Sequence, residues 1–241
     1  LFLRAIKKNN LILFSRYRKK FTSKLLILIF SKFFFNKILY VDRINRFYRN
    51  ISIHQTSIMF EFLDKCKISY YKNINLEKFL GDIELIKSSR DICTIHLSGK
   101  WINRYYNEEN FLQLLSKINT KYNIALTTDE TTSTKFIKIF NKYPILENNL
   151  YLKDLDLKNI LIFRDLNFEN WIRVIQSSKL VITPECGCTH IAGICKIKSK
   201  IIYDADNSPE MIYQEYYPWK SDHEKFIFNQ INLNSFLTKN L

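Results

Sequence analysis

The sequence predicts an α/β protein built on a parallel, Rossmann-like sheet. Between residues 90 and 205, short apolar runs of strand length alternate with segments whose apolar residues recur at helical spacing. Such alternation is typical of a parallel sheet with helices packed on its faces. Strands covered on both faces are expected to be continuous apolar runs, as these are. The five expected strands are Ile92–Leu97, Ile124–Leu126, Ile160–Phe163, Leu180–Ile182 and Lys200–Tyr203.

Three amphipathic helices are expected between these strands. The acidic residues Glu108 and Glu109 precede the first of them, where they would favour the positive end of the helix dipole. Each helix has an apolar stripe that would pack on the sheet. The stripes are formed by Phe111, Leu114, Leu115 and Ile118, by Phe136, Ile137 and Phe140, and by Trp171, Val174 and Ile175.

The first part of the chain has a less regular pattern. Residues 1–35 mix short helical and strand-like segments, and Ile38–Val41 is expected to be a strand. Residues 51–63 carry apolar side chains on one helical face. The polar, mixed stretch Tyr70–Ser89 is interpreted as a connection between two parts of the protein.

The chain is strongly basic, with a formal net charge of +14. Basic residues are densest in 1–50, where they are mixed with apolar residues, so a peripheral contact with an anionic membrane surface is one expectation. A lysine-rich solvated surface is the alternative. The best apolar run, Leu25–Phe30, is much shorter than the ~20 residues of a membrane span. Five scattered cysteines argue against a secreted disulfide scaffold and predict a cytoplasmic protein.

The most informative stretch is Lys179–Gly193, KLVITPECGCTHIAG, which predicts strand, tight loop and helix. Pro184 cannot donate to a sheet ladder, so the strand should end there. Gly187 would allow a close backbone approach or a positive φ at the turn. Ligands of open α/β sheets bind beside such loops, and the free N–H groups of the following helix attract phosphate.

The loops after successive strands should therefore meet at one edge of the sheet. A positive loop, an acidic loop and a helix N-terminus at the same edge suit a sugar nucleotide, because cations and N–H groups bind the diphosphate and carboxylates accept hydrogen bonds from hydroxyls. The loop residues that carry this expectation are Ser98, Gly99, Lys100, Arg104, Asp129, Glu130, Glu185, Gly187 and Thr189.

Two of these segments resemble the heptosyltransferase family, glycosyltransferase family 9. Glu185, Gly187, His190 and Ala192 are similar to its acid-x-Gly-x-x-His-x-Ala signature, with Glu185 in place of the usual Asp and Cys186 in place of Thr or Ser. The signature covers the expected strand–loop–helix unit. An ordinary βα turn with a capping acid and a packed His is the alternative interpretation.

A second segment, 104–111, looks like the family's Lys-x-Trp-Pro-x-Glu-x-Phe motif, in which the Lys contacts the donor phosphate. On that alignment Arg104 replaces the Lys and Tyr106 the Trp, with Lys100 as a nearby alternative. Arg keeps the charge but is not an equivalent of Lys. Glu130 looks like the acid that the family places near the nucleotide. The resemblance covers 90–241 well and about 37–66 weakly.

The resemblance implies a GT-B fold, with two Rossmann-like domains facing a cleft. It implies an inverting glycosyltransferase that transfers a sugar from a nucleotide donor, commonly ADP-heptose, to the core of bacterial lipopolysaccharide, with no required metal or cofactor. Residues 86–241 would be the donor-binding domain and residues 1–85 a remnant of the acceptor-side domain plus the connection. The family's general base would lie in the part that is missing, so this chain is expected to be inactive alone, and no catalytic residue is assigned.

The resemblance also implies a set of donor-binding residues. Most of them belong to the loop after the first strand of the regular region and to the turn that opens the helix after Pro184. The set is Ser98, Gly99, Lys100, Arg104, Glu130, Glu185, Cys186, Gly187, Cys188, Thr189 and His190.

Two other classes of protein remain as alternatives. Cys186, Cys188, His190 and Cys195 are ligand types that suit zinc, although the first two are closer together than in most zinc sites. The net charge of +14 would suit a nucleic-acid-binding module, but no recognised nucleic-acid motif is present. The partners that the resemblance implies are a nucleotide sugar and a lipopolysaccharide acceptor, and no nucleic acid is expected.

Overall fold

The structure, a computed structural model, describes residues 10–15, 37–42, 54–65, 67–70, 84–129, 132, 134–147, 152, 155–205, 209–219, 221–228 and 232–239. The chain forms two compact units, Leu1–Asn73 and Ile74–Leu241. The sequence places the division between residues 85 and 86, and the roles assigned to the two parts stay predictions.

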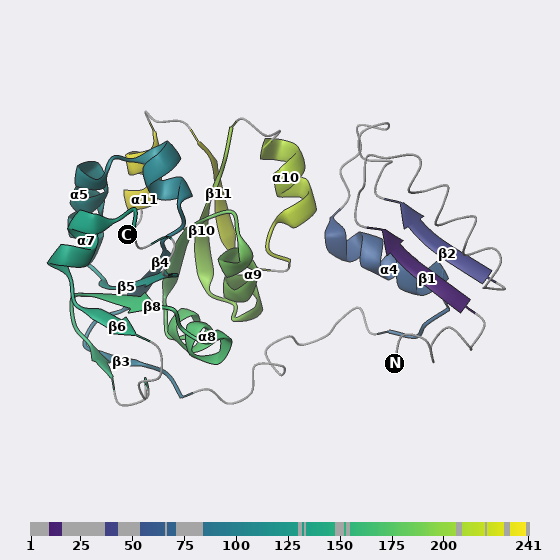
Figure 1. Cartoon of the computed structure of the whole chain (residues 1–241), viewed down its shortest axis with the longest axis horizontal. Helices are drawn as coiled ribbons and strands as arrows, with labels where there is room; N and C mark the ends of the chain where they lie inside the picture. Colours follow the sequence, from purple (N-terminus) through teal and green to yellow (C-terminus); the bar gives the residue numbers. More distant parts are fainter. Residues whose placement is uncertain are drawn as a thin grey trace. The chain divides into compact units, whose positions relative to one another are not determined.

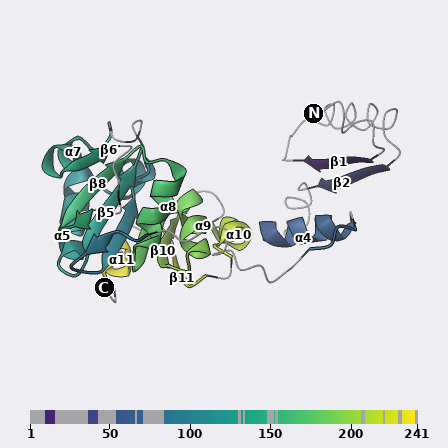
Figure 2. The ribbon, with the colours of Figure 1, turned by 90° about the horizontal axis from the view of Figure 1, so that it is seen from below.

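The first unit contains a parallel pair of strands, β1 (Asn10–Ser15) and β2 (Lys37–Asp42), and the helix α4 (Gln55–Lys65). The helix lies alongside the pair (Figures 1 and 2). The strand expected at Ile38–Val41 is confirmed within β2, and the helix expected in 51–63 is confirmed as α4. Most of the basic segment 1–50 lies outside the described residues, so a membrane contact there stays a prediction.

The second unit is organised around a seven-stranded, wholly parallel sheet (Figure 1). Its strand order is β11-β10-β9-β4-β5-β8-β6. Two short strands, β3 and β7, form a separate parallel pair, and along the chain they come just before β4 and β8. The strands are β3 (Lys87–Ser88), β4 (Ile92–His96), β5 (Asn123–Thr128), β6 (Ile145–Glu147), β7 (Asp156–Leu157), β8 (Ile160–Arg164), β9 (Leu180–Pro184), β10 (Lys198–Tyr203) and β11 (His223–Ile227).

All five strands expected from apolar runs are confirmed as β4, β5, β8, β9 and β10. These are the inner strands of the sheet, and every residue of β5 and β9 is buried. The two strands of this sheet that the sequence did not reveal, β6 and β11, are its edges. An edge strand has only one neighbour, so β6 and β11 stay partly exposed and lack the continuous apolar run that marks a buried strand.

Helices cover both faces of the sheet (Figure 2). Helices α5, α7 and α11 share one core with the sheet, whereas α8 and α9 contribute to another that includes Val181 of β9. A π-helical turn, Trp101–Tyr105, follows β4. The helices are α5 (Glu108–Asn119), α7 (Ile137–Lys142), α8 (Phe168–Gln176), α9 (Gly187–Ile194), α10 (Pro209–Tyr216) and α11 (Leu233–Thr238).

Helix α5 shows how the sequence specifies these elements. Asn107 is its N-cap, and the side-chain oxygen accepts a hydrogen bond of 2.8 Å from the N–H of Asn110. The apolar stripe expected from the 3.6-residue period is buried, and Phe111 and Leu115 have no exposed surface. None of the helices in the described part of the chain has the length and apolar character that crossing a membrane would require.

Candidate functional site

The sheet has a topological switch point between β4 and β9. From β4 the chain crosses to β5 on one side, while β9 pairs with β4 on the other side and leads to β10. The helices that follow, α5 and α9, pack into different cores. Loops that leave neighbouring strands in opposite directions open a crevice at the carboxyl edge, where α/β proteins bind ligands.

The loop after β4 is held by Trp101, which is fully buried. Its indole N–H donates a hydrogen bond of 2.8 Å to the carbonyl of His96, the last residue of β4. Because Lys100 immediately precedes this anchor, it is kept at the carboxyl edge of the sheet. Ser98 lies in the same loop, and its buried hydroxyl oxygen has no hydrogen-bond partner among the described residues.

Four charged side chains from three loops meet at this edge, and we call Lys100, Arg104, Glu185 and Asp204 the charged cluster. The Lys100 ammonium lies 3.2 Å from the Glu185 carbonyl oxygen and 3.8 Å from its carboxylate. It also lies 3.6 Å from a carboxylate oxygen of Asp204, and Arg104 pairs with that oxygen at 2.7 Å. The expected convergence of the Lys100–Arg104 loop with Glu185 is thus confirmed.

Asp204 was not identified from the sequence, although it directly follows β10, so the rule that selected the other loop residues would also select it. Its second carboxylate oxygen accepts a hydrogen bond of 2.5 Å from the Tyr105 hydroxyl. Burial and this hydrogen bond to Asp204 raise the pKa of Tyr105 far above its usual range. The raised pKa favours the protonated hydroxyl, which donates to Asp204.

The turn that opens α9, from Cys186 to Thr189, is stabilised by local hydrogen bonds. Cys186 is its N-cap, and the Thr189 hydroxyl donates a hydrogen bond of 2.7 Å to the Cys186 carbonyl. The side chains of Cys188 and Thr189 are fully buried, whereas His190 is exposed. The side chains of Cys188 and Thr189, both expected to bind the donor, thus do not reach a ligand, and the N–H of Thr189 donates to the Cys186 carbonyl at 3.2 Å.

Gly187 is exposed at the first turn of α9 and does not have a positive φ. A Cβ atom built there would meet only the Trp171 ring, at 3.9 Å, which is an ordinary contact. The expectation of a positive φ at Gly187 is therefore wrong. The other expectation, that a ligand approaches the backbone closely at this glycine, stays a prediction.

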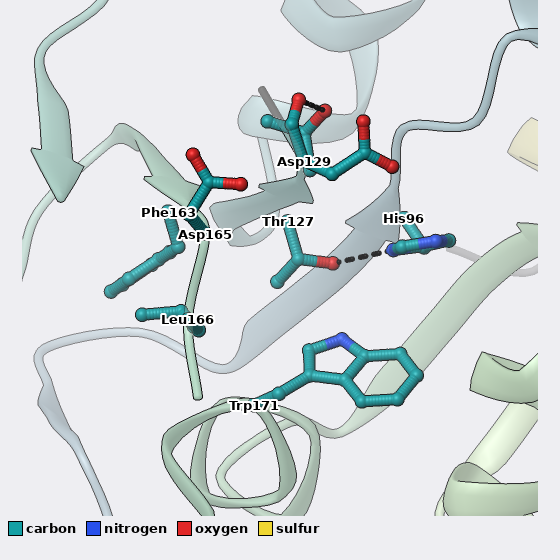
Figure 3. Close-up of a pocket in the computed structure, with 8 residues that line it drawn as sticks. His96, Thr127, Asp129, Phe163, Asp165, Leu166 and Trp171 are labelled. Carbon is teal, nitrogen blue, oxygen red and sulfur yellow. Dashed lines mark hydrogen bonds between the residues drawn. The ribbon is translucent and has the colours of Figure 1, made fainter. Parts of the chain in front are cut away.

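A cavity of about 340 Å³ lies at the same edge of the sheet, beyond the ends of β4, β5 and β8 (Figure 3). The strand ends and the loops after them provide most of its wall, and α8 provides the rest. The lining residues are His96, Thr127, Thr128, Asp129, Phe163, Asp165, Leu166 and Trp171.

Two aromatic rings form one side of this cavity. The rings of His96 and Trp171 are 5.6 Å apart, and His96 Nδ1 lies 3.0 Å from the Thr127 hydroxyl (Figure 3). Burial lowers the pKa of His96, against an opposing effect of Asp129, so a neutral imidazole is favoured. The buried indole N–H of Trp171 has no hydrogen-bond partner among the described residues, and Figure 3 shows it turned towards Thr127.

The cavity residues were mostly missed by the sequence reasoning. Asp129 was recognised as a loop residue, and Glu130, its neighbour and the expected nucleotide contact, lies outside the described residues. Trp171 was assigned to the apolar stripe of a helix. Its position in the first turn of α8, directly after a strand-end loop, was a signal that it could face a ligand instead.

The zinc alternative finds no geometric support in the described part of the chain. No three His, Cys, Asp or Glu side chains lie together there as a metal site would require. Cys188 is fully buried, and burial raises the pKa of its thiol well above the usual value, which disfavours the thiolate that binds zinc.

Comparison with known proteins supports the fold but not a closer relationship. No protein-family model and no curated protein matches the sequence. Among solved structures, a glycosyl transferase of family 9 from Veillonella parvula matches with a TM-score of 0.55 and 10% identity, over 87% of this chain and 61% of that chain.

The Escherichia coli heptosyltransferase WaaC matches as well. Its structure with ADP gives a TM-score of 0.57 and 11% identity, over 88% of this chain and 62% of WaaC. Its structure with ADP-2-deoxy-2-fluoro heptose gives a TM-score of 0.56 and 12% identity, over 88% of this chain and 58% of WaaC. The chain thus spans about three-fifths of the length of these proteins. The fold that the resemblance implies is confirmed for the part of these proteins that the chain spans: the chain is α/β with a parallel, Rossmann-like sheet, and it is similar in fold to part of these family 9 glycosyltransferases.

Proposed function

We propose that this chain is the donor-binding part of a glycosyltransferase of the heptosyltransferase type, with Ile74–Leu241 as the nucleotide-sugar-binding unit. The observation that carries the proposal is the contact of Lys100 with Glu185 at the turn that opens α9, with Arg104 joined to the same cluster through Asp204, at the switch point of a sheet of this fold. This arrangement provides cations and helix N–H groups in one place, and these are the groups that bind a diphosphate.

The cavity beside the charged cluster suits the nucleoside of such a donor. It offers the Trp171 and His96 rings for stacking and the carboxylates of Asp129 and Asp165 for hydroxyl groups. The buried Trp171 N–H can donate to a base or sugar oxygen. Family resemblance favours adenine, and ADP-heptose is the donor we propose.

Transfer would proceed with inversion to an acceptor hydroxyl of the lipopolysaccharide core. Such a reaction requires a general base to remove the hydroxyl proton as the sugar is attacked. We assign this role to no residue of the chain. A cytoplasmic location, with peripheral contact between the basic N-terminal segment and the anionic inner membrane, is part of the same proposal.

The proposal is tested first by calorimetry with ADP and UDP. ADP should bind, and more tightly than UDP. Arg104→Ala should weaken ADP binding by about tenfold or more, because a charge-assisted hydrogen bond contributes ~1.5–3 kcal/mol. Lys138→Ala is the control, since Lys138 pairs with Glu109 on the surface. Equal affinity of the parent and Arg104→Ala would contradict the assigned role.

Transfer itself is tested with ADP-heptose and a heptose-free lipid A–Kdo acceptor. Release of ADP that depends on the acceptor would support a transferase. Binding of ADP without affinity for ADP-heptose would point away from a sugar donor and towards a nucleotide-binding protein of another kind.

A further inference from the structure

Asp204 occupies the place in the charged cluster where a ligand's phosphate oxygen would be expected. One of its carboxylate oxygens lies 2.7 Å from the Arg104 guanidinium and 3.6 Å from the Lys100 ammonium. A phosphate bound by the same two cations would present an anionic oxygen to both in this manner. Asp204 thus satisfies the charges that the proposed donor would need.

The charges of the cluster also balance. Lys100 and Arg104 are countered by Glu185 and Asp204, so two cations meet two carboxylates. A donor diphosphate is attracted by net positive charge, and a balanced cluster offers little of it. An anionic ligand must therefore compete with a carboxylate that belongs to the protein.

Within the Arg104–Asp204 pair, the arginine is the partner that can move. The Asp204 side chain is only 9% exposed, and its other oxygen is held by the hydroxyl of Tyr105, whose buried ring packs against Phe228 with 4.7 Å between centroids. The Arg104 side chain is 43% exposed. Arg104 can therefore leave Asp204 for a ligand, while Asp204 stays in position.

We propose that Asp204 is an internal competitor for the donor's phosphate, which lowers the affinity of the site for anions and so determines how much negative charge a ligand must bring to displace it. The inference rests on the proposed function, because it takes the charged cluster to be the phosphate site. It distinguishes Asp204 from a residue that merely orients Arg104 and Lys100, since a positioning residue would strengthen binding and a competitor weakens it.

The test is calorimetry of the parent chain and of Asp204→Asn with ADP, AMP and adenosine. Asparagine keeps the size of the side chain and an oxygen that accepts from Tyr105, but removes the charge. Competition predicts that Asp204→Asn binds ADP about threefold to tenfold more tightly, AMP somewhat more tightly, and adenosine with the affinity of the parent. In an Arg104→Ala background the gain for ADP should be smaller, because one of the two competing contacts is absent.

Matched variants make the outcome specific. Glu185→Gln removes the other carboxylate, whose ion pair among the described residues is with Lys100 at 3.8 Å, so its gain should be smaller than that of Asp204→Asn. Asp204→Ser removes the same charge in a smaller side chain and replaces Asp204→Asn if the latter does not fold, as judged by thermal unfolding.

The results separate the two proposals. If ADP binds the parent and Asp204→Asn binds it equally or more weakly, the competitor role is wrong and the proposed function stands. A gain that is as large for adenosine as for ADP also contradicts competition for phosphate. If ADP binds neither the parent nor any variant, the proposed function fails, and the inference fails with it.

Discussion

The charged cluster and the cavity lie at the same edge of one sheet, yet they are built in different ways. The cluster consists of charged side chains on loops after β4, β9 and β10, three of them partly exposed and Asp204 almost buried, and they are joined by ion pairs. The cavity is formed by residues at the ends of β4, β5 and β8 and by the Trp171 ring. In the cluster, Arg104 can exchange its ion-pair partner, whereas the shape of the cavity is fixed by the ends of the strands.

The difference indicates a division of tasks in ligand binding. Charged groups on loops suit phosphates, which are recognised by charge and can be exchanged for internal anions. A walled cavity with aromatic rings suits a nucleoside, which is recognised by shape and stacking. Trp101 joins the two regions, because it follows Lys100 in the chain and hydrogen-bonds the carbonyl of His96.

Trp101→Ala should damage both regions at once and have the largest effect. Removing a fully buried Trp leaves a large cavity, and we expect a loss of about 3–5 kcal/mol in the free energy of unfolding, measured by urea titration. Ile137→Ala is the control, since Ile137 is 63% exposed and its removal should cost less than about 0.5 kcal/mol. A Trp101→Ala variant as stable as the control would show that the loop is not anchored by this residue.

Lys100→Ala and Trp171→Leu should separate the two regions. Lys100→Ala should weaken ADP binding by about tenfold or more and leave adenosine binding unchanged, because the lost contact is with phosphate. Trp171→Leu should weaken both ligands similarly, by ~1–3 kcal/mol, because the lost contact is stacking on the base. Calorimetry with both ligands is the measurement. The same pattern in the two variants would mean that the regions do not divide the ligand as proposed.

The two glycines of α9 provide a smaller and sharper comparison. At Gly193 a Cβ would lie 3.0 Å from Pro218 Cβ, so Gly193→Ala should destabilise the fold by about 1–3 kcal/mol. At Gly187 there is room for a Cβ, so the free energy of unfolding of Gly187→Ala should lie within about 0.5 kcal/mol of that of the parent. The variant should nevertheless bind ADP less tightly, because the added methyl group would keep the ligand away from the backbone of this turn. Thermal unfolding and calorimetry measure the two effects. Full ADP affinity in Gly187→Ala would place the ligand away from this turn.

The smallest expected effect is a pH dependence that arises in the cavity. Burial lowers the pKa of His96 in the folded chain, so the unfolded chain binds the proton more readily. Stability should therefore be fully present above about pH 6.5 and decrease as the pH falls through the window down to the lowered pKa, by at most about 1.4 kcal/mol per pH unit. Urea unfolding at pH 7.5 and 5.5 should show a larger loss in the parent than in His96→Gln. Equal losses would mean that His96 does not contribute.

Local patterns in the sequence were sufficient for the inner sheet and for half of the site. Apolar runs identified β4, β5, β8, β9 and β10, because strands covered on both faces must be apolar throughout. The proline at the end of β9 and the turn after it were located from the chemistry of single residues. Lys100, Arg104 and Glu185 were selected because each follows a strand, and their convergence followed from the parallel arrangement.

The sequence by itself determined the α/β class, the inner strands and the edge at which a site should form, since hydrophobic period and turn chemistry act over a few residues. Only the tertiary structure decided which side chains meet. Asp204 pairs with Arg104, a hundred positions away, because β10 lies next to β9 and β9 next to β4. Trp171 faces the cavity because α8 lies beside the ends of β4, β5 and β8. Strand order and helix placement depend on how the whole unit buries its apolar surface, which no local pattern specifies.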